Sequence, residues 1–270
     1  MRKPAAGGAS MTGLPSAWQL CAIGATLGAI FGSFLGAVLV RSASGRSIVA
    51  APSTCDSCGH RLTVTELVPI LSFIAQRGRC RTCGAPIDRW QLACEVGGAI
   101  VGAASWVGAT PGALQGTAAM LLGWGLLLLA LLDLRYMWLP RRFVATLAGI
   151  GVVFALIRSR DAGWDGEPLV IAALGGATGF AMLWVVRMLY ARGRGREGMG
   201  AGDPPLLGAI GIWLGPVGVI GVVLGGSLIG IAAAAAMHLT GRRVTADTVL
   251  PLGTCLAAAA WPLFLLQGFG

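Results

Sequence analysis

Two aspartates stand next to long apolar runs, where a carboxylate is expected only for a specific reason. Asp133 ends the apolar run 126–132, and Asp203 follows Gly200-Ala201-Gly202 at the start of another. Charged groups at membrane depth are costly and are commonly functional. Two neighbouring carboxylates can share a proton, so that one activates water while the other polarises a carbonyl. Asp133 and Asp203 are therefore candidate catalytic residues of an aspartic peptidase.

The sequence around each aspartate also allows a simpler interpretation. Asp203 precedes Pro204, as an N-cap precedes a proline in the first helical turn. Asp133 is harder to explain, because a carboxylate at a helix C-terminus opposes the helix dipole unless it pairs with Arg135 or Arg142. The same dipole argument predicts Asp203 as the base and Asp133 as the acid. Gly200 and Gly202 would let a substrate strand approach, because glycine lacks a Cβ.

Four of the seven cysteines form two Cys-x-x-Cys-Gly knuckles, Cys55/Cys58 and Cys80/Cys83. Two such knuckles predict a tetrahedral, structural zinc site with four thiolate ligands. The alternatives are two redox pairs or two disulfides, and disulfides are rare in the reducing cytoplasm where the arginine pattern places this loop. His60 is expected to be a surface residue, because four thiolates already satisfy the metal.

The composition indicates an all-α, polytopic membrane helix bundle. Of 270 residues, 56% are hydrophobic and 11% are charged, with a mean hydropathy of +0.77. A soluble domain of this length needs a larger charged surface. Apolar runs that approach the length of a transmembrane helix predict eight spans. These runs are 17–40, 91–109, 116–133, 143–157, 168–190, 204–215, 216–238 and 249–267. Gly215-Pro216 is the only visible break between the sixth and the seventh run, which predicts a tight turn there.

The basic residues predict the orientation of these spans. Fifteen arginines fall in one set of alternate loops, and only four Lys or Arg residues fall in the other. The positive-inside rule places the richer set, with both aspartates and the cysteines, on the cytoplasmic side of a bacterial inner membrane. The predicted organisation is an N-terminal segment with the first span (1–40), a zinc-ribbon-like insertion (41–90) and a transmembrane peptidase domain (91–270). The net charge of +9 is thus explained by topology, and no nucleic-acid partner is expected.

A series of short motifs runs along most of the chain. The segments are Phe31–Gly36, Pro52–Gly59, Glu66–Ser72, Arg77–Gly84 with Glu95, Asp133 with Leu139-Pro140, Gly198–Asp203 and Leu250–Gly253. In this order they resemble the type IV prepilin peptidase family, which comprises membrane aspartic peptidases of the Gly-x-Gly-Asp type. The resemblance assigns the catalytic roles to Asp133 and Asp203.

The resemblance implies cleavage of the basic leader of prepilin or pseudopilin partners, just after a Gly, at the cytoplasmic face. It also implies methylation of the new N-terminus with S-adenosylmethionine, for which the residues alone give no independent sign. The chain departs from the family at three positions: Gly36 replaces the usual Asn, Arg141 the usual Asp, and Pro205 the usual Lys. Gly36 bears on methylation, and the other two bear on substrate preference.

Two other functions compete with the peptidase. In a non-enzymatic assembly or scaffold protein, zinc would hold a docking domain and the aspartates would only cap helices. In a transporter, the aspartates would relay protons, but both are expected at one face rather than at the midplane, and no inverted repeat is visible.

Overall fold

The computed structural model describes residues 16–43, 53–107, 113–194, 199–241 and 250–267. In these ranges regular structure is helical apart from two isolated β-bridges, which agrees with the predicted all-α class. The elements are α1 (Ala17–Ala43), η1 (Val64–Leu67), α2 (Leu71–Ala75), α3 (Arg89–Val107), α4 (Ala113–Tyr136), α5 (Arg141–Asp161), α6 (Glu167–Arg194), α7 (Asp203–Leu239) and α8 (Leu252–Gln267).

The predicted apolar runs correspond to the long helices of the structure. In the described residues, five helices are long and apolar enough to cross a membrane: α1, α4, α5, α6 and α7. Helix α3 also matches a predicted run but carries Arg89 and Glu95. Helix α8 has only 16 residues. The chain is therefore a polytopic bundle, as its composition predicted.

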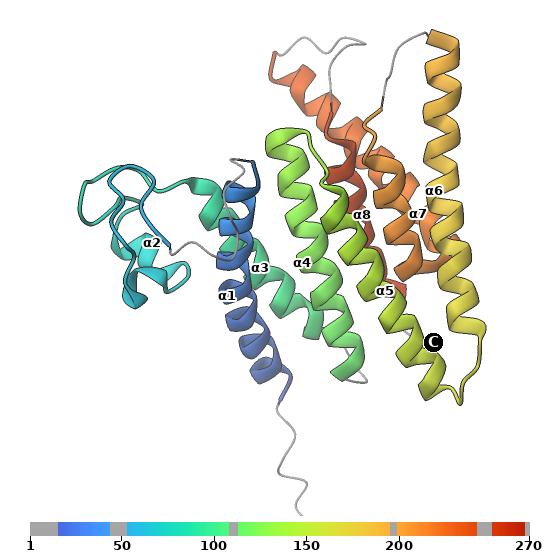
Figure 1. Ribbon diagram of the computed structural model, residues 1–270, viewed down its shortest axis with the longest axis horizontal. Coiled ribbons are helices and arrows are strands. Elements are labelled where there is room, and N and C mark those ends of the chain that lie inside the picture. Colours follow the sequence, from blue (N-terminus) through green and yellow to red (C-terminus); the bar gives the residue numbers. More distant parts are fainter. Residues whose placement is uncertain (1–15, 44–52, 108–112, 195–198, 242–249, 268–270) are drawn as a thin grey trace, which may run out of the picture.

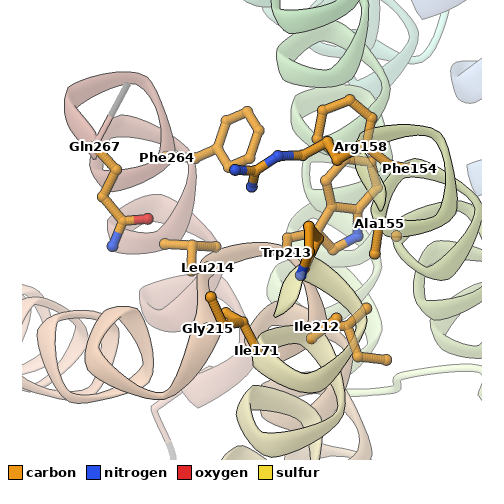
Figure 2. Close-up of a pocket in the computed structure, with 13 residues that line it drawn as sticks. Phe154, Ala155, Arg158, Ile171, Ile212, Trp213, Leu214, Gly215, Phe264 and Gln267 are labelled. Atoms are coloured by element: carbon orange, nitrogen blue, oxygen red, sulfur yellow. The ribbon is translucent and has the colours of Figure 1, made fainter. Parts of the chain in front are cut away.

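Helix α7 contains two of the predicted runs, 204–215 and 216–238. The backbone leaves the helical region at Gly215, with φ 71° and ψ 177°, and Pro216 follows. Proline lacks the N–H that a helix needs at that point, and glycine tolerates positive φ. Figure 2 shows this break beside Trp213, whose ring lies 5.7 Å from that of Phe154 and 5.9 Å from that of Phe264. The predicted break at Gly215-Pro216 is confirmed.

Glycines set the closest helix contacts. Along α1, Gly24 and Gly28 face Gly102 and Gly98 of α3, and a Cβ on either α1 residue would overlap the facing carbonyl oxygen. Gly175 of α6 meets the carbonyl of Gly211 in α7 in the same way. Small residues allow membrane helices to approach closely and to gain dispersion energy. These glycines are thus explained by close packing between helices.

Helix α4 stands between two groups of helices (Figure 1). On one side it shares an apolar core with α1 and α3 that includes Leu39, Cys94 and Leu132. On the other side it shares a larger core with α5, α7 and α8 that includes Leu126, Leu206 and Leu256. Because α4 belongs to both cores, the position of its C-terminal end, which carries Asp133, is fixed by both groups.

The cysteine module, defined here as residues 53–88, projects beside α1 and α3 (Figure 1). It lies within the predicted insertion 41–90, because α1 ends at Ala43 and α3 begins at Arg89. Within it only Glu66 and Cys80 are buried. So small an interior cannot stabilise a fold by hydrophobic burial alone.

Candidate active site

Asp133 lies one turn before the end of α4 and is 6% exposed. The backbone N–H of Thr254 donates a 2.9 Å hydrogen bond to Asp133 Oδ2, and the Thr254 hydroxyl lies 3.3 Å from the same oxygen. That hydroxyl also lies 2.9 Å from the carbonyl oxygen of Ala130. Thr254 belongs to the first turn of α8, where backbone N–H groups have no partner inside the helix. The start of α8 therefore holds the carboxylate of Asp133.

The contact between Thr254 and Asp133 weakens the helix-dipole argument by which Asp133 was predicted as the acid and Asp203 as the base. The prediction treated Asp133 only as a residue at the C-terminus of its own helix. In the structure, the positive end of the α8 dipole faces the same carboxylate. Both aspartates thus lie at a helix N-terminus, and the dipole argument no longer distinguishes them.

Asp133 pairs with neither of the two arginines considered as its partners, Arg135 and Arg142. Arg135 pairs instead with Asp88, with 2.7 Å between Nη1 and Oδ2, and its guanidinium lies 5.6 Å from the ring centre of Trp90. Arg142 lies over the ring of Phe143 at 4.8 Å. Among the described residues no Lys or Arg nitrogen comes within 4.0 Å of Asp133. The alternative in which Asp133 serves only as an arginine partner is therefore not supported.

Asp203 is the first residue of α7 and is likewise 6% exposed. The two glycines before it have different tasks. A Cβ on Gly202 would lie 2.6 Å from the Cβ of Leu139, in the segment that follows Asp133. A Cβ on Gly200 would lie 3.0 Å from Asp203 Oδ2. Gly202 thus lets the start of α7 pack against the α4–α5 connection, while Gly200 leaves the carboxylate accessible.

Both aspartates line one open cavity of about 890 Å³. Its other walls come from the end of α1, the α4–α5 connection, the Gly200–Gly202 turn and the start of α8. Met137, which lines the cavity, has the positive φ of 50° that is uncommon for a non-glycine residue and recurs at functional sites. The structure thus brings together all four predicted residues of this site.

Thr254 belongs to this site but was not among the residues predicted from the sequence. The only available signal was its position, one residue after Gly253 at the start of an apolar run. A Cβ on Gly253 would lie 3.0 Å from Asp133 Oδ2, so this glycine also makes room for the carboxylate.

The structure describes the surroundings of the three residues that depart from the family pattern. Arg141 lines the cavity with the aspartates, and Pro205 lies in the first turn of α7, where no N–H is required. Gly36 packs against the side-chain amide of Gln91 in α3. The space of a larger side chain at position 36 is thus taken by Gln91.

The four knuckle cysteines form a separate cluster. Their sulfur atoms all lie within 4.8 Å of one another, and Cys55 and Cys83 are 3.9 Å apart. Tetrahedral zinc with Zn–S bonds of about 2.3 Å requires S···S distances of about 3.8 Å. In each knuckle the glycine has φ near 70° and donates its N–H to the first cysteine: Gly59 to Cys55 O, Gly84 to Cys80 O. The cluster can hold a metal ion.

The backbone of each knuckle favours the thiolate of its first cysteine. Hydrogen bonds from the backbone of Cys58 and Ser57 lower the pKa of Cys55 to about 7, and those from Cys83 and Thr82 lower the pKa of Cys80. His60 lies outside the sulfur cluster, with Nε2 3.3 Å from Glu66 Oε2. The donor set is therefore four sulfurs, as zinc prefers.

In the comparison with known proteins, two family models match successive parts of the chain. Residues 26–108 match the bacterial peptidase A24 N-terminal domain, and residues 120–235 match the type IV leader peptidase family. A protein of Pseudomonas aeruginosa is 32% identical over 94% of this chain and 92% of its own length. One of Burkholderia pseudomallei is 33% identical over 96% and 92%, and one of Aeromonas hydrophila 34% over 82% and 73%. All three are named prepilin leader peptidase/N-methyltransferase. No solved structure matches the chain.

Proposed function

Because the chain belongs to the type IV leader peptidase family, we propose that it cuts prepilin-like proteins just after a glycine, with Asp133 and Asp203 as the catalytic pair. The observation that carries this proposal is that two buried carboxylates, 70 residues apart in sequence, line one cavity. Two close carboxylates share one proton because both cannot easily be ionised.

The proposed reaction uses the pair in opposite protonation states. The ionised carboxylate takes a proton from water as the water oxygen attacks the carbonyl carbon after the glycine. The protonated carboxylate donates a hydrogen bond to the carbonyl oxygen, where negative charge develops. When the C–N bond breaks, a proton passes to the leaving nitrogen, which becomes the new N-terminus. Gly200 and Gly202 border the cavity and leave room for a substrate strand.

The test is cleavage of a prepilin-like peptide by the purified protein in detergent, followed by mass spectrometry. Asp133→Asn and Asp203→Asn each remove one member of the pair and are expected to stop leader removal. Asp161→Asn is the matched control, because Asp161 is exposed at the far end of α5. Near-wild-type cleavage by either active-site variant would refute the aspartic mechanism. It would leave the non-enzymatic scaffold as the better account of these residues.

We further propose that the cavity and the cysteine module face the cytoplasm of a bacterial inner membrane, which the excess of arginine in their loops supports. A phosphatase that is active only outside the cytoplasm would be inserted at 161–166, between α5 and α6, or between α6 and α7 at 195–198. Activity is expected only for the first insertion. The opposite pattern would invert the topology and contradict the proposal.

Zinc and S-adenosylmethionine are the proposed cofactors. The four cysteine sulfurs would hold zinc in a closed, structural site without an open position for water. The relatives' printed names support methylation of the new N-terminus. Mass spectrometry of the product reads both activities, because leader loss and a methyl gain change the mass separately. The absence of the methyl gain, with leader removal intact, would restrict the chain to peptidase activity.

A further inference from the structure

A cavity of about 90 Å³, called the distal cavity below, lies between α5, α6, α7 and α8 (Figure 2). Helix α5 begins at Arg141, which lines the aspartate cavity, and reaches the distal cavity 17 residues later at Arg158. At about 1.5 Å per residue, the two positions are about 26 Å apart along the helix. The distal cavity therefore lies at the other end of the bundle, and the proposed cleavage reaction gives it no role.

The broken helix α7 forms one wall of the distal cavity. Ile212, Leu214 and Gly215 line it just before Pro216. Because proline has no N–H, Pro216 cannot donate to the carbonyl of Ile212 as a continuous helix would require. A Cβ on Gly215 would lie 2.8 Å from Ile171 Cγ2 of α6, which also lines the cavity. The break in α7 thus shapes this cavity.

Most of the lining is aromatic or apolar, and it carries a single charge. Phe154, Trp213 and Phe264 contribute their rings, and the indole N–H of Trp213 already donates a 3.0 Å hydrogen bond to the carbonyl of Leu147. Of the described residues that line the cavity, Arg158 is the only charged one. A charge in apolar surroundings is stabilised by an opposite charge and by hydrogen bonds. The distal cavity therefore suits a small anion.

Two arginines near the end of α5 have different surroundings. Arg160 is exposed and does not line the distal cavity. Arg158 is half-buried, and Figure 2 shows its guanidinium extending past Phe264 toward the side that Gln267 lines. An arginine that only reached for water at the helix end would resemble Arg160. The inward direction of Arg158 indicates a contact inside the cavity.

Gln267 supplies a second polar side chain. It is the last residue of α8, is exposed and lines the distal cavity. A Cβ on Gly218 would lie 3.0 Å from its Nε2, so the amide lies against the second half of α7. The planar guanidinium of arginine matches the oxygens of a phosphate, and an amide N–H can donate to a further oxygen. The two side chains together suit a phosphate group.

The volume limits what can enter. A cavity of about 90 Å³ holds a few water molecules or one compact oxyanion, and it is far below the roughly 300 Å³ at which sites for drug-sized molecules begin. A larger ligand can therefore place only a compact polar head in the distal cavity.

The distal cavity lies where a lipid headgroup is expected. Arg158 is in the last turn of α5, which is apolar enough to cross a membrane, and the exposed Trp164 follows in the next turn. Tryptophan is enriched where the membrane meets water. Strongly exposed apolar side chains stand close in sequence to the lining residues: Val217 is 78% exposed, and Leu266 is 81% exposed. Such side chains would face acyl chains, which a free phosphate does not have.

We propose that the distal cavity binds the phosphate of a phospholipid headgroup, with Arg158 as its cationic partner. Arg158 and Gln267 donate hydrogen bonds to the phosphate oxygens, and the acyl chains lie against the exposed apolar side chains of α7 and α8. Basic pockets between transmembrane helices bind lipid headgroups in the same way. This inference does not depend on the peptidase proposal.

The test is binding of phosphatidylglycerol to the full-length protein in detergent, measured by native mass spectrometry. Arg158→Gln removes the charge, so Kd is expected to rise about tenfold to a hundredfold, because hydrogen bonds to charged groups are the stronger ones. Arg160→Gln is the matched control, since it removes the same charge from an exposed residue outside the lining. Its Kd should equal that of the wild type.

A second variant protects the test against misfolding. Gln267→Leu keeps the approximate size of the side chain and removes its amide, at an exposed position at the end of α8. Its Kd is expected to rise about twofold to tenfold, the usual effect of one neutral hydrogen bond. Thermal unfolding without added lipid should be similar for all three variants and the wild type, which shows that they are folded.

Two further ligands separate a lipid headgroup from a free anion. Diacylglycerol with the same acyl chains lacks the phosphate and should bind equally to the wild type and to Arg158→Gln. Inorganic phosphate tests the free anion. If only phosphate binding depends on Arg158, the cavity takes a free anion and the lipid proposal is wrong. Unchanged phosphatidylglycerol binding in Arg158→Gln, or an equal loss in Arg160→Gln, would also overturn the proposal, because the lipid would then respond to net charge alone.

Discussion

The cysteine module and the helix bundle bury their side chains in opposite ways. Within residues 53–88 only Glu66 and Cys80 are buried, and the backbone is held by tight turns and two β-bridges. The bundle that carries Asp133 and Asp203 buries leucines such as Leu122, Leu129 and Leu206 completely. The module thus offers a four-sulfur site that could hold a metal in place of an apolar core, whereas the bundle relies on close contact between apolar helices.

This difference also sets the chemistry that each region supports. In the bundle, carboxylates are costly, and the structure places two of them together at helix ends beside a cavity. In the module, carboxylates are easily tolerated, and yet Glu66 is buried with one oxygen unpaired among the described residues. In each region, the candidate site is therefore marked by a carboxylate that is unusual there: one within apolar helices in the bundle, and a buried one in the module.

The largest expected effect is the loss of zinc from the cysteine module, which should leave the helix bundle folded. Cys55→Ser with Cys80→Ser should abolish zinc binding and unfold the module, because structural zinc contributes about 10–16 kcal/mol in small zinc domains. Cleavage should stay within about tenfold of the wild type, because no residue of 53–88 lines the aspartate cavity. Metal analysis, limited proteolysis and the peptide assay measure the three properties.

Cys21→Ser is the control for that experiment, because Cys21 lies in α1 outside the cluster. It should keep full zinc content. If the zinc-free variant loses cleavage completely while its helices remain folded, the two regions are not independent and the comparison fails.

The next effect tests whether the two aspartates act as a unit. Each single Asp→Asn change at Asp133 or Asp203 should lower kcat by about 10²- to 10⁴-fold, the usual contribution of a general acid or base. The double variant should be no slower than the worse single one, because residues that act together are not additive. Single-turnover cleavage measures all three. Multiplying losses in the double variant would show that the two carboxylates work separately.

A smaller effect is expected from Gly202→Ala in the bundle. The new Cβ would lie 2.6 Å from the Cβ of Leu139, so the start of α7 must move away from the segment after Asp133. Such overpacking costs about 1–3 kcal/mol. Thermal unfolding in detergent and the peptide assay should both record the loss.

Gly149→Ala provides the comparison, since a Cβ there meets nothing within 4 Å and Gly149 lies inside α5. Replacing a mid-helix glycine by alanine should stabilise the protein by about 0.5–1 kcal/mol. Equal behaviour of the two variants would remove the packing role assigned to Gly202.

The smallest effect concerns Thr254, which positions Asp133. Thr254→Val removes the hydroxyl but keeps the 2.9 Å hydrogen bond from the backbone N–H to Asp133 Oδ2. A typical hydrogen bond is worth about 0.5–1.5 kcal/mol, so kcat should fall by about tenfold or less while KM stays constant. Thr254→Ser should restore kcat. A change in KM alone, or no rescue by Ser, would show that the hydroxyl does not act through Asp133.

The sequence predicted much of this architecture because the signals are local. Apolar runs predicted the long helices, and Gly215 before Pro216 predicted the break in α7. Two Cys-x-x-Cys-Gly knuckles predicted the sulfur cluster, since four thiolates at that spacing have few other uses. The catalytic roles of Asp133 and Asp203 remain predictions. Their common cavity agrees with the prediction, which rested on the topology and on the resemblance of both segments to the peptidase family.

The sequence did not predict contacts between distant segments. The assignment of Asp133 as the acid rested on one helix dipole, and the start of α8, about 120 residues later, changed the balance.

By itself, the sequence determined which segments are apolar enough to form the long helices, which four cysteines gather in one cluster and which carboxylates stand beside apolar runs. These properties follow from hydropathy, spacing and residue type along short stretches of chain. Only the tertiary structure decided what each carboxylate faces, because that depends on which helix ends meet. Close glycine contacts, such as Gly202 against Leu139, bring those ends together, and a glycine's partner cannot be identified from its own surroundings in sequence.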